Sequence, residues 1–125
     1  MNKLTMMIVD DSFVIRAVIS NAHNSKKYDL IAVATNGEEA ISQYLKYKPQ
    51  IVTMDLTMPK MDGLQCIEKL IALNPNIQII VVSALNDEAT GIKALKLGAA
   101  GFVTKPFTEE DICEAIDIVA EYIEG

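Results

Sequence analysis

The sequence predicts an α/β protein built on a five-stranded parallel sheet that is covered by helices on both faces. Apolar runs alternate with amphipathic stretches five times along the chain. Several of these runs are continuous rather than alternating, which is typical of parallel strands buried on both faces. Because crossovers between parallel strands are right-handed, repeated β-α units of this kind form one doubly wound sheet.

The strands are predicted from the apolar runs, and the helices from the stretches between them. The apolar runs occupy residues 6–9, 30–34, 51–54, 79–82 and 102–103. Helical patterns occupy residues 13–23, 38–47, 64–73 and 88–97, and a fifth follows Thr108. Turn signals separate these elements, because TNGEEA opens the second helix and NPN follows the third.

The fifth helix has the clearest pattern. Its apolar residues repeat on one helical face, at Ile112, Ala115, Ile116, Val119, Ala120 and Ile123. Thr108 and Asp111 resemble a capping box with Asp in place of Glu. Gly98 stands where a glycine commonly ends the preceding helix.

The composition indicates one globular domain of 125 residues, half of them hydrophobic. The apolar runs are far shorter than the ~20 residues that span a bilayer, and the N-terminus turns acidic too early for a signal peptide. The formal charge of −6 argues against a nucleic-acid partner and favours cations or basic protein surfaces. Cys66 and Cys113 stand far apart and are expected to be free thiols in a reducing cytoplasm.

Polar side chains end four of the five predicted strands. Ligands of an open α/β sheet bind at the carboxyl ends of its strands, so these side chains are expected at one edge. In chain order the groups are Asp10-Asp11-Ser12, Asp55, Ser83 and Thr104-Lys105-Pro106, whereas the second strand ends in Thr35-Asn36. Taken singly, each group has an ordinary explanation as a cap, a turn residue or a solvated side chain. Their joint occurrence predicts a site.

Three carboxylates, a hydroxyl and an ammonium at one edge suit phosphoryl chemistry. Carboxylates this close repel one another, and a divalent cation removes the repulsion. Oxygen ligands without nearby His or Cys favour Mg²⁺ over zinc, and Mg²⁺ commonly shares a phosphate with its carboxylates. Lys105 adds a positive charge for that phosphate, and Ser83 adds a hydroxyl donor. The set predicts phosphoryl transfer to a carboxylate nucleophile.

Four motifs in order resemble a response-regulator receiver domain, similar to the single-domain chemotaxis response regulators. They are IVDDS, MDLTMPKMDG, VVSA and GFVTKPF, and the resemblance covers essentially the whole chain. It implies a flavodoxin-like (βα)5 fold with the strand order 2-1-3-4-5, an order already known for this family. It also implies a single receiver domain over residues 1–125, without an output domain.

The resemblance implies which residues carry the phosphoryl group and the metal. Asp55 would be the phosphoacceptor. Asp10, Asp11 and Asp55 would hold Mg²⁺, or Mn²⁺ in its place, together with the backbone carbonyl of Thr57. The phosphodonor would be a phosphohistidine on a sensor histidine kinase.

It further implies how the phosphorylated state is read. Lys105 would pair with Asp55 and then with the phosphoryl group, and the Lys105–Pro106 bond would be cis. Ser83 would hydrogen-bond a phosphoryl oxygen, and Phe102 would follow it as an aromatic switch residue. The surface of the fourth helix, fifth strand and fifth helix would then change its affinity for an effector protein that the sequence does not name.

The chain departs from the chemotaxis pattern near the switch. Phe102 stands where those proteins typically carry Tyr, and Ser83 replaces the frequent Thr. Thr57 and Leu85, each two residues past a site residue, are expected to tune the lifetime of the phosphate. Leu85→Glu is predicted to change the rate of self-dephosphorylation severalfold. Ile118 and Tyr122 lie off the apolar face of the last helix, where they could form the rim of a partner surface.

Three other functions remain open at this point. A phosphate sink or relay intermediate would use the same site without an effector, and the sequence does not separate it from the effector-binding function. An Mg²⁺-dependent aspartyl phosphatase of the haloacid dehalogenase type usually carries a second Asp where Thr57 stands, and it needs a cap domain. A flavodoxin-like cofactor binder needs a phosphate loop after the first strand, but residues 10–16, DDSFVIR, lack glycine. We therefore expect a signalling protein rather than a metabolic enzyme.

Overall fold

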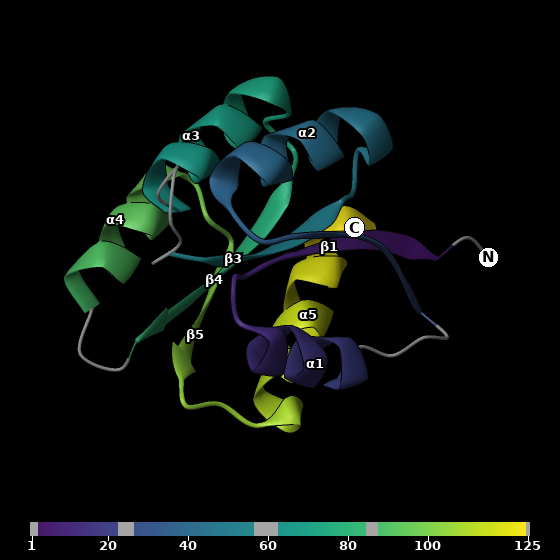
Figure 1. Ribbon diagram of the computed structural model, residues 1–125, viewed down its shortest axis with the longest axis vertical. Coiled ribbons are helices and arrows are strands. Elements are labelled where there is room, and N and C mark those ends of the chain that lie inside the picture. Colours follow the sequence, from purple (N-terminus) through teal and green to yellow (C-terminus); the bar gives the residue numbers. More distant parts are fainter. Residues whose placement is uncertain (1–2, 23–26, 57–62, 85–87, 125) are drawn as a thin grey trace.

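The computed structural model describes residues 3–22, 27–56, 63–84 and 88–124 of the chain. In this part of the chain strands and helices alternate throughout (Figure 1). The strands are β1 (Leu4–Val9), β2 (Tyr28–Ala34), β3 (Ile51–Asp55), β4 (Gln78–Ala84) and β5 (Gly101–Lys105). The helices are α1 (Phe13–Ala22), α2 (Gly37–Tyr47), α3 (Gly63–Leu73), α4 (Glu88–Leu97) and α5 (Glu109–Glu124).

The strands form one parallel sheet in the order β2-β1-β3-β4-β5, which confirms the predicted fold class and strand order. The order reverses where β1 pairs with both β2 and β3, so the carboxyl ends of β1 and β3 lie side by side. Val9 stands opposite Met54, and Asp55 stands opposite Val82. A ligand site is expected at this point of an open α/β sheet.

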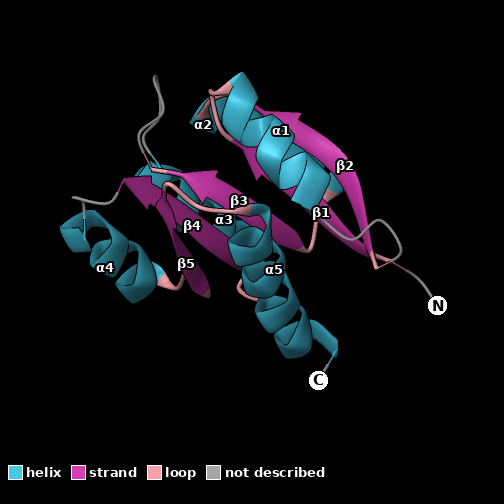
Figure 2. Cartoon of the chain, turned by 90° about the horizontal axis from the view of Figure 1, so that it is seen from below, coloured by secondary structure: helices cyan, strands magenta, loops and turns pink. Residues whose placement is uncertain are grey.

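Helices cover both faces of the sheet, with α1 and α5 on one face and α2, α3 and α4 on the other (Figure 2). A hydrophobic core lies on each face of the sheet, and successive residues of a strand point into one core and then the other. In β3, for example, Val52 and Met54 belong to the core under α2 and α3, whereas Ile51 belongs to the core under α1 and α5. This double burial explains why the strands read as continuous apolar runs.

The strands extend one to three residues beyond the predicted runs. Asp55 is the last residue of β3 rather than its successor, and Ser83 lies within β4. Lys105 likewise ends β5 and pairs with Ala84. The predicted boundaries were wrong because they followed side-chain polarity, whereas the ladder is built from backbone groups that every residue other than proline supplies in full.

The predicted helix ends are confirmed for α4 and α5. The backbone N–H of Asp111 donates to Thr108 Oγ1 at 3.1 Å, and the N–H of Thr108 donates to Asp111 Oδ2 at 2.9 Å. This reciprocal pair is the capping box. Gly98 follows α4 with a φ of +118°, a conformation that residues with a side chain rarely adopt.

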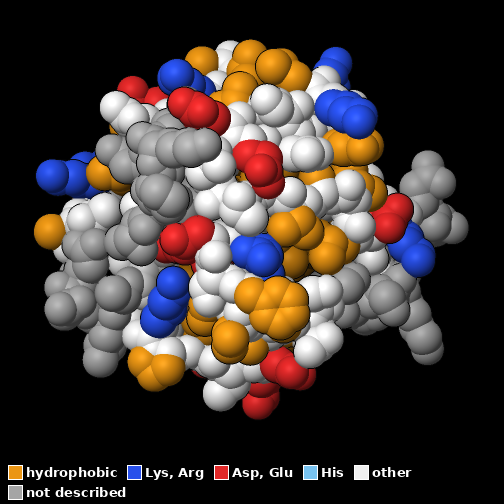
Figure 3. Space-filling model, viewed as in Figure 1, with side chains coloured by type: hydrophobic (Ala, Val, Ile, Leu, Met, Phe, Trp, Pro, Cys, Tyr) orange, Lys and Arg blue, Asp and Glu red, His pale blue; other side chains and the backbone are white. Residues whose placement is uncertain are grey.

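None of the helices in the described residues is long and apolar enough to cross a bilayer. On the face seen in Figure 1, acidic, basic and hydrophobic side chains are interspersed (Figure 3). The excess of acidic over basic residues is therefore not gathered into one acidic surface on this face.

Candidate functional site

Three carboxylates from two neighbouring strands meet at the carboxyl edge of the sheet. Asp10 and Asp11 follow β1, and Asp55 ends β3. Each offers an oxygen within 4.8 Å of the oxygens of the other two. Asp10 and Asp55 are buried, whereas Asp11 is exposed. The arrangement is a pocket of hard oxygen ligands with one side open to water.

Asp10 is anchored at three of its polar atoms. Its backbone N–H donates to Ala34 O at 3.0 Å, and its backbone carbonyl accepts a hydrogen bond of 2.9 Å from Arg16. Its Oδ1 accepts a hydrogen bond of 2.9 Å from the N–H of Ser12. The other carboxylate oxygen, Oδ2, is buried and has no hydrogen-bond partner among the described residues. A buried oxygen without a donor is costly, and a bound cation would satisfy it.

Lys105 faces two of the carboxylates from the end of β5. Its Nζ lies 3.9 Å from Asp10 Oδ2 and 3.8 Å from Asp55 Oδ1. Both distances exceed those of a hydrogen bond, so the contacts are electrostatic. The ammonium is partly exposed, which leaves it accessible to an anion that approaches Asp55.

The pKa of Asp10 is raised from 3.8 to about 6. Burial of the carboxyl is the largest cause, and the charges of Asp55 and Asp11 raise the pKa further. The hydrogen bond from Ser12 and the charge of Lys105 act in the opposite direction without cancelling the rise. The protein alone therefore does not fully compensate the negative charge, and the donor set fits Mg²⁺.

Backbone geometry places Asp55 close to the start of α3. A Cβ on Gly63 would lie 2.6 Å from Leu56 Cα and 2.8 Å from Asp55 O, so only glycine permits this approach. Ser83 is buried in β4 and pairs with Thr104 of β5, one residue before the pair Ala84–Lys105. The Lys105–Pro106 bond is cis, the isomer that the resemblance implies.

Not every predicted residue can be placed. Thr57 and Leu85 lie outside the described residues. Phe102 is half-buried in β5, and its ring lies against Gly91 of α4. Ile118 and Tyr122 of α5 are exposed, as their position off the apolar face predicts.

Sequence reasoning missed Arg16, whose hydrogen bond holds the corner between β1 and α1. Its one signal is its place in the first helical turn after the two aspartates. A guanidinium does not ligate a cation, so the pattern of metal-binding side chains does not point to it. Gly91 was missed as well, because a glycine inside a helical pattern has no local explanation.

The fold and the acidic site define a class of protein, and comparison with known sequences agrees. The family model for the response regulator receiver domain matches residues 6–117, and the chain belongs to this family. The chain is 40% identical to the chemotaxis protein CheY of Thermotoga maritima over 93% of its own length and 97% of that protein. It is 37% identical to CheY of Listeria monocytogenes over 94% of its length and 99% of that protein. It is thus a CheY-like receiver domain of two-component signalling, and this is not a family of metabolic enzymes.

Solved structures show the same fold. The receiver domain of AraT from Geobacillus stearothermophilus superposes with a TM-score of 0.92 at 26% identity, covering 98% of this chain and 97% of that one. A CheY from Borrelia burgdorferi, solved as a CheX–CheY–BeF3–Mg complex, has a TM-score of 0.87 at 32% identity. That match covers 94% of this chain and 89% of the Borrelia chain.

Proposed function

We propose that the chain is a cytoplasmic response regulator that accepts a phosphoryl group on Asp55 from a sensor histidine kinase. The observation that carries this proposal is the place of the Asp55 carboxylate, which is buried, within reach of Asp10 and Asp11, and 3.8 Å from Lys105. An ordinary structural carboxylate would not be surrounded by two more carboxylates. The function is chemotaxis or similar signalling, by analogy with the CheY relatives.

The step joins an Asp55 carboxylate oxygen to phosphorus and breaks the bond between phosphorus and the kinase histidine nitrogen. The electron pair of that bond leaves with the imidazole, and Asp55 becomes an acyl phosphate. Lys105 lies where its ammonium can follow the charge from the carboxylate to the phosphoryl oxygens. Ser83 is assigned the hydrogen bond to one of these oxygens.

Asp10, Asp11 and Asp55 would hold Mg²⁺, with the carbonyl of Thr57 as a further ligand. When bound, the ion neutralises the carboxylates and the charge that develops on the transferred phosphoryl group. The Oδ2 of Asp10, which accepts no hydrogen bond from the described residues, supports this assignment. A second support is the Borrelia complex, in which a CheY similar to this chain was solved with magnesium and beryllium fluoride.

The phosphorylated state is read, in this proposal, at the surface formed by α4, β5 and α5. Ser83 moves toward the phosphoryl group, Phe102 moves with it, and the surface changes its affinity for an effector protein. Four large hydrophobic side chains are exposed there: Ile92, Leu95, Ile118 and Tyr122. The Borrelia protein binds CheX in its complex, but the effector of this chain is not identified.

Intact-mass measurement after incubation with acetyl phosphate and Mg²⁺ tests the proposal. Wild type should gain one phosphoryl group, and Asp55→Ala should gain none. Asp29→Ala, an exposed residue of β2, serves as the control and should behave as wild type. Removal of Mg²⁺ with a chelator should abolish the gain. A phosphoryl group retained by Asp55→Ala would place the acceptor elsewhere.

A second experiment separates an effector-binding switch from a phosphate sink. The chain is used as bait in a pull-down with and without beryllium fluoride and Mg²⁺. A partner enriched only with beryllium fluoride supports the switch. Phosphorylation without any such partner supports the sink or relay function.

A further inference from the structure

Gly91 lies inside α4, where glycine is unfavourable. In a helix interior, glycine lowers the folding equilibrium constant roughly fivefold relative to alanine. The φ of Gly91 is not positive, so the backbone does not require a glycine there. Gly91 is also buried, unlike its exposed neighbours Ile92 and Lys93. The reason for glycine must therefore lie in what packs against it.

The ring of Phe102 occupies the space that a side chain at position 91 would need. A Cβ built on Gly91 would lie 1.9 Å from Cε2 of Phe102, 2.7 Å from Cζ and 2.8 Å from Cδ2. Carbon atoms pack at about 3.5–4.0 Å, so no alanine fits while the ring stays. The three nearest atoms belong to one ring, which rests directly on the helix backbone.

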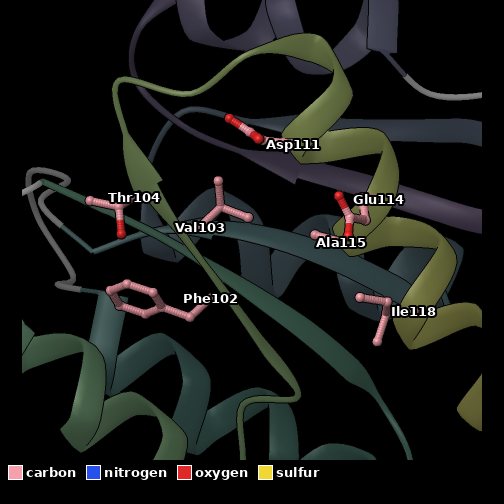
Figure 4. Close-up of a pocket in the computed structure, with 7 residues that line it drawn as sticks. All are labelled: Phe102, Val103, Thr104, Asp111, Glu114, Ala115 and Ile118. Carbon is pink, nitrogen blue, oxygen red and sulfur yellow. The ribbon is translucent and has the colours of Figure 1, made fainter.

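The other side of Phe102 is open. β5 is an edge strand, and Phe102 borders a groove of about 370 Å³ between β5 and α5. Figure 4 shows Asp111, Glu114, Ala115 and Ile118 of α5 on the far side of this groove from Phe102. Phe102 thus borders this groove from the edge strand, while its ring rests on α4.

We propose that Gly91 is a positioning residue, which forms the seat of the Phe102 ring and so couples the ring to α4. The inference rests on the proposed function, in which Phe102 moves after Asp55 is phosphorylated. The structure shows the ring in the seat, and the proposal assigns this position to the unphosphorylated state. Phosphorylation draws the ring out, and the vacated seat alters α4 beside the exposed Ile92 and Leu95. An alanine at position 91 removes the seat and shifts the population toward the second position.

A double-mutant cycle tests the seat by stability alone. The proteins are wild type, Gly91→Ala, Phe102→Ala and the double variant, unfolded in urea. Without the ring, Gly91→Ala should raise the folding equilibrium constant roughly fivefold. With the ring present, this gain should vanish or reverse. The matched pair Lys93→Gly and Lys93→Ala measures the glycine-to-alanine difference at an exposed position of the same helix. Equal gains in both Phe102 backgrounds would overturn the proposal.

Two further measurements test the coupling. In wild type, nuclear Overhauser contacts should join the Phe102 ring to Gly91 Hα, and they should weaken on phosphorylation with acetyl phosphate and Mg²⁺. In Gly91→Ala the ring resonances should already resemble those of the phosphorylated wild type. At a fixed acetyl phosphate concentration, the phosphorylated fraction of Gly91→Ala should exceed that of wild type. Departure of the ring from the seat and phosphorylation of Asp55 should each favour the other. Ring contacts with α4 that persist unchanged through phosphorylation would refute the coupling. If no protein is phosphorylated, the proposed function fails, while the stability cycle still decides whether the seat exists.

Discussion

The guanidinium of Arg16 donates a hydrogen bond of 2.9 Å to the backbone carbonyl of Asp10. Arg16 is not a metal ligand. Its guanidinium also lies over the ring of Phe13, which is exposed on the protein surface. The bond ties the first turns of α1 to the end of β1. It thereby fixes the corner from which Asp10 and Asp11 project, and a site of this kind depends on how firmly its ligands are held.

Removal of this bond should weaken metal binding. We expect Arg16→Met to lower the Mg²⁺ affinity about tenfold, as is common when a group that orients a metal ligand is lost. Arg16→Lys keeps the positive charge, so it separates the lost hydrogen bond from the lost charge. Titration calorimetry provides the measurement, with Lys46→Met on α2 as the control. Equal affinity in Arg16→Met and wild type would show that the corner is held without Arg16.

The raised pKa of Asp10 makes stability depend on pH. The carboxyl has a pKa of about 6 when folded and 3.8 in the reference state, so the folded chain holds this proton more tightly. Its stabilising effect is complete below the unfolded pKa and is lost as the pH rises through the folded one. We expect the metal-free protein to lose roughly 2 kcal/mol from this group between pH 4 and 7. Asp10→Asn should remove this dependence and be more stable at pH 7, as urea unfolding would show. A pH profile identical to that of wild type would contradict the assignment.

Proton binding at Asp10 should also compete with Mg²⁺. Because the pKa of this carboxyl is about 6, the affinity for Mg²⁺ should be nearly constant above pH 7. Below pH 6 it should fall, approaching tenfold per pH unit when one proton must leave. Calorimetric titrations at several pH values provide the measurement. An affinity that stays constant down to pH 5 would mean that Asp10 is already ionised without the metal.

Thr53 carries a buried hydroxyl that has no hydrogen-bond partner among the described residues. Its neighbours in the sheet are Ile8 and Ile80. Thr53→Val replaces the hydroxyl by a methyl group of similar size, so it should stabilise the fold by about 1–2 kcal/mol. Thr5→Val is the matched control, because Thr5 Oγ1 accepts a hydrogen bond of 3.1 Å from Gln50. The control should lose stability, and a loss in Thr53→Val as well would reveal an ordered partner for its hydroxyl.

Lys48 ends α2 in the left-handed conformation, with φ of 48° and ψ of 57°. Its N–H donates to Tyr44 O at 2.7 Å. Glycine adopts this conformation without steric cost, so Lys48→Gly should stabilise the protein by about 1 kcal/mol. Lys46→Gly, two residues earlier in the regular helix, should have the opposite sign. Thermal unfolding of the two variants compares them directly.

Much of the site could be predicted because its residues end strands. Asp55 directly follows a buried run, and parallel strands must bring their carboxyl ends to one edge. The order of the strands came from the family resemblance, since periodicity does not rank strands across a sheet. The strand boundaries were less accurate, because Ser83 and Lys105 are polar and yet belong to the ladder.

Arg16 and Gly91 could not be predicted in the same way. The partner of Arg16 is a backbone carbonyl, which every residue has, so no pattern of side chains points to it. Gly91 and Phe102 are brought together by the packing of α4 on β5, and nothing in either local stretch indicates the other. Both features depend on contacts between elements.

The sequence by itself determined which chemical groups this protein has and at which edge of the sheet they gather, because alternation of strands and helices leaves few topologies. Only the tertiary structure decided the electrostatic state of those groups. The burial of Asp10, the 3.9 Å between its Oδ2 and Lys105, and the raised pKa arise from atoms that are distant in the chain. Desolvation and Coulomb energies depend on the positions of atoms in space, so they cannot be read from the order of residues in the sequence.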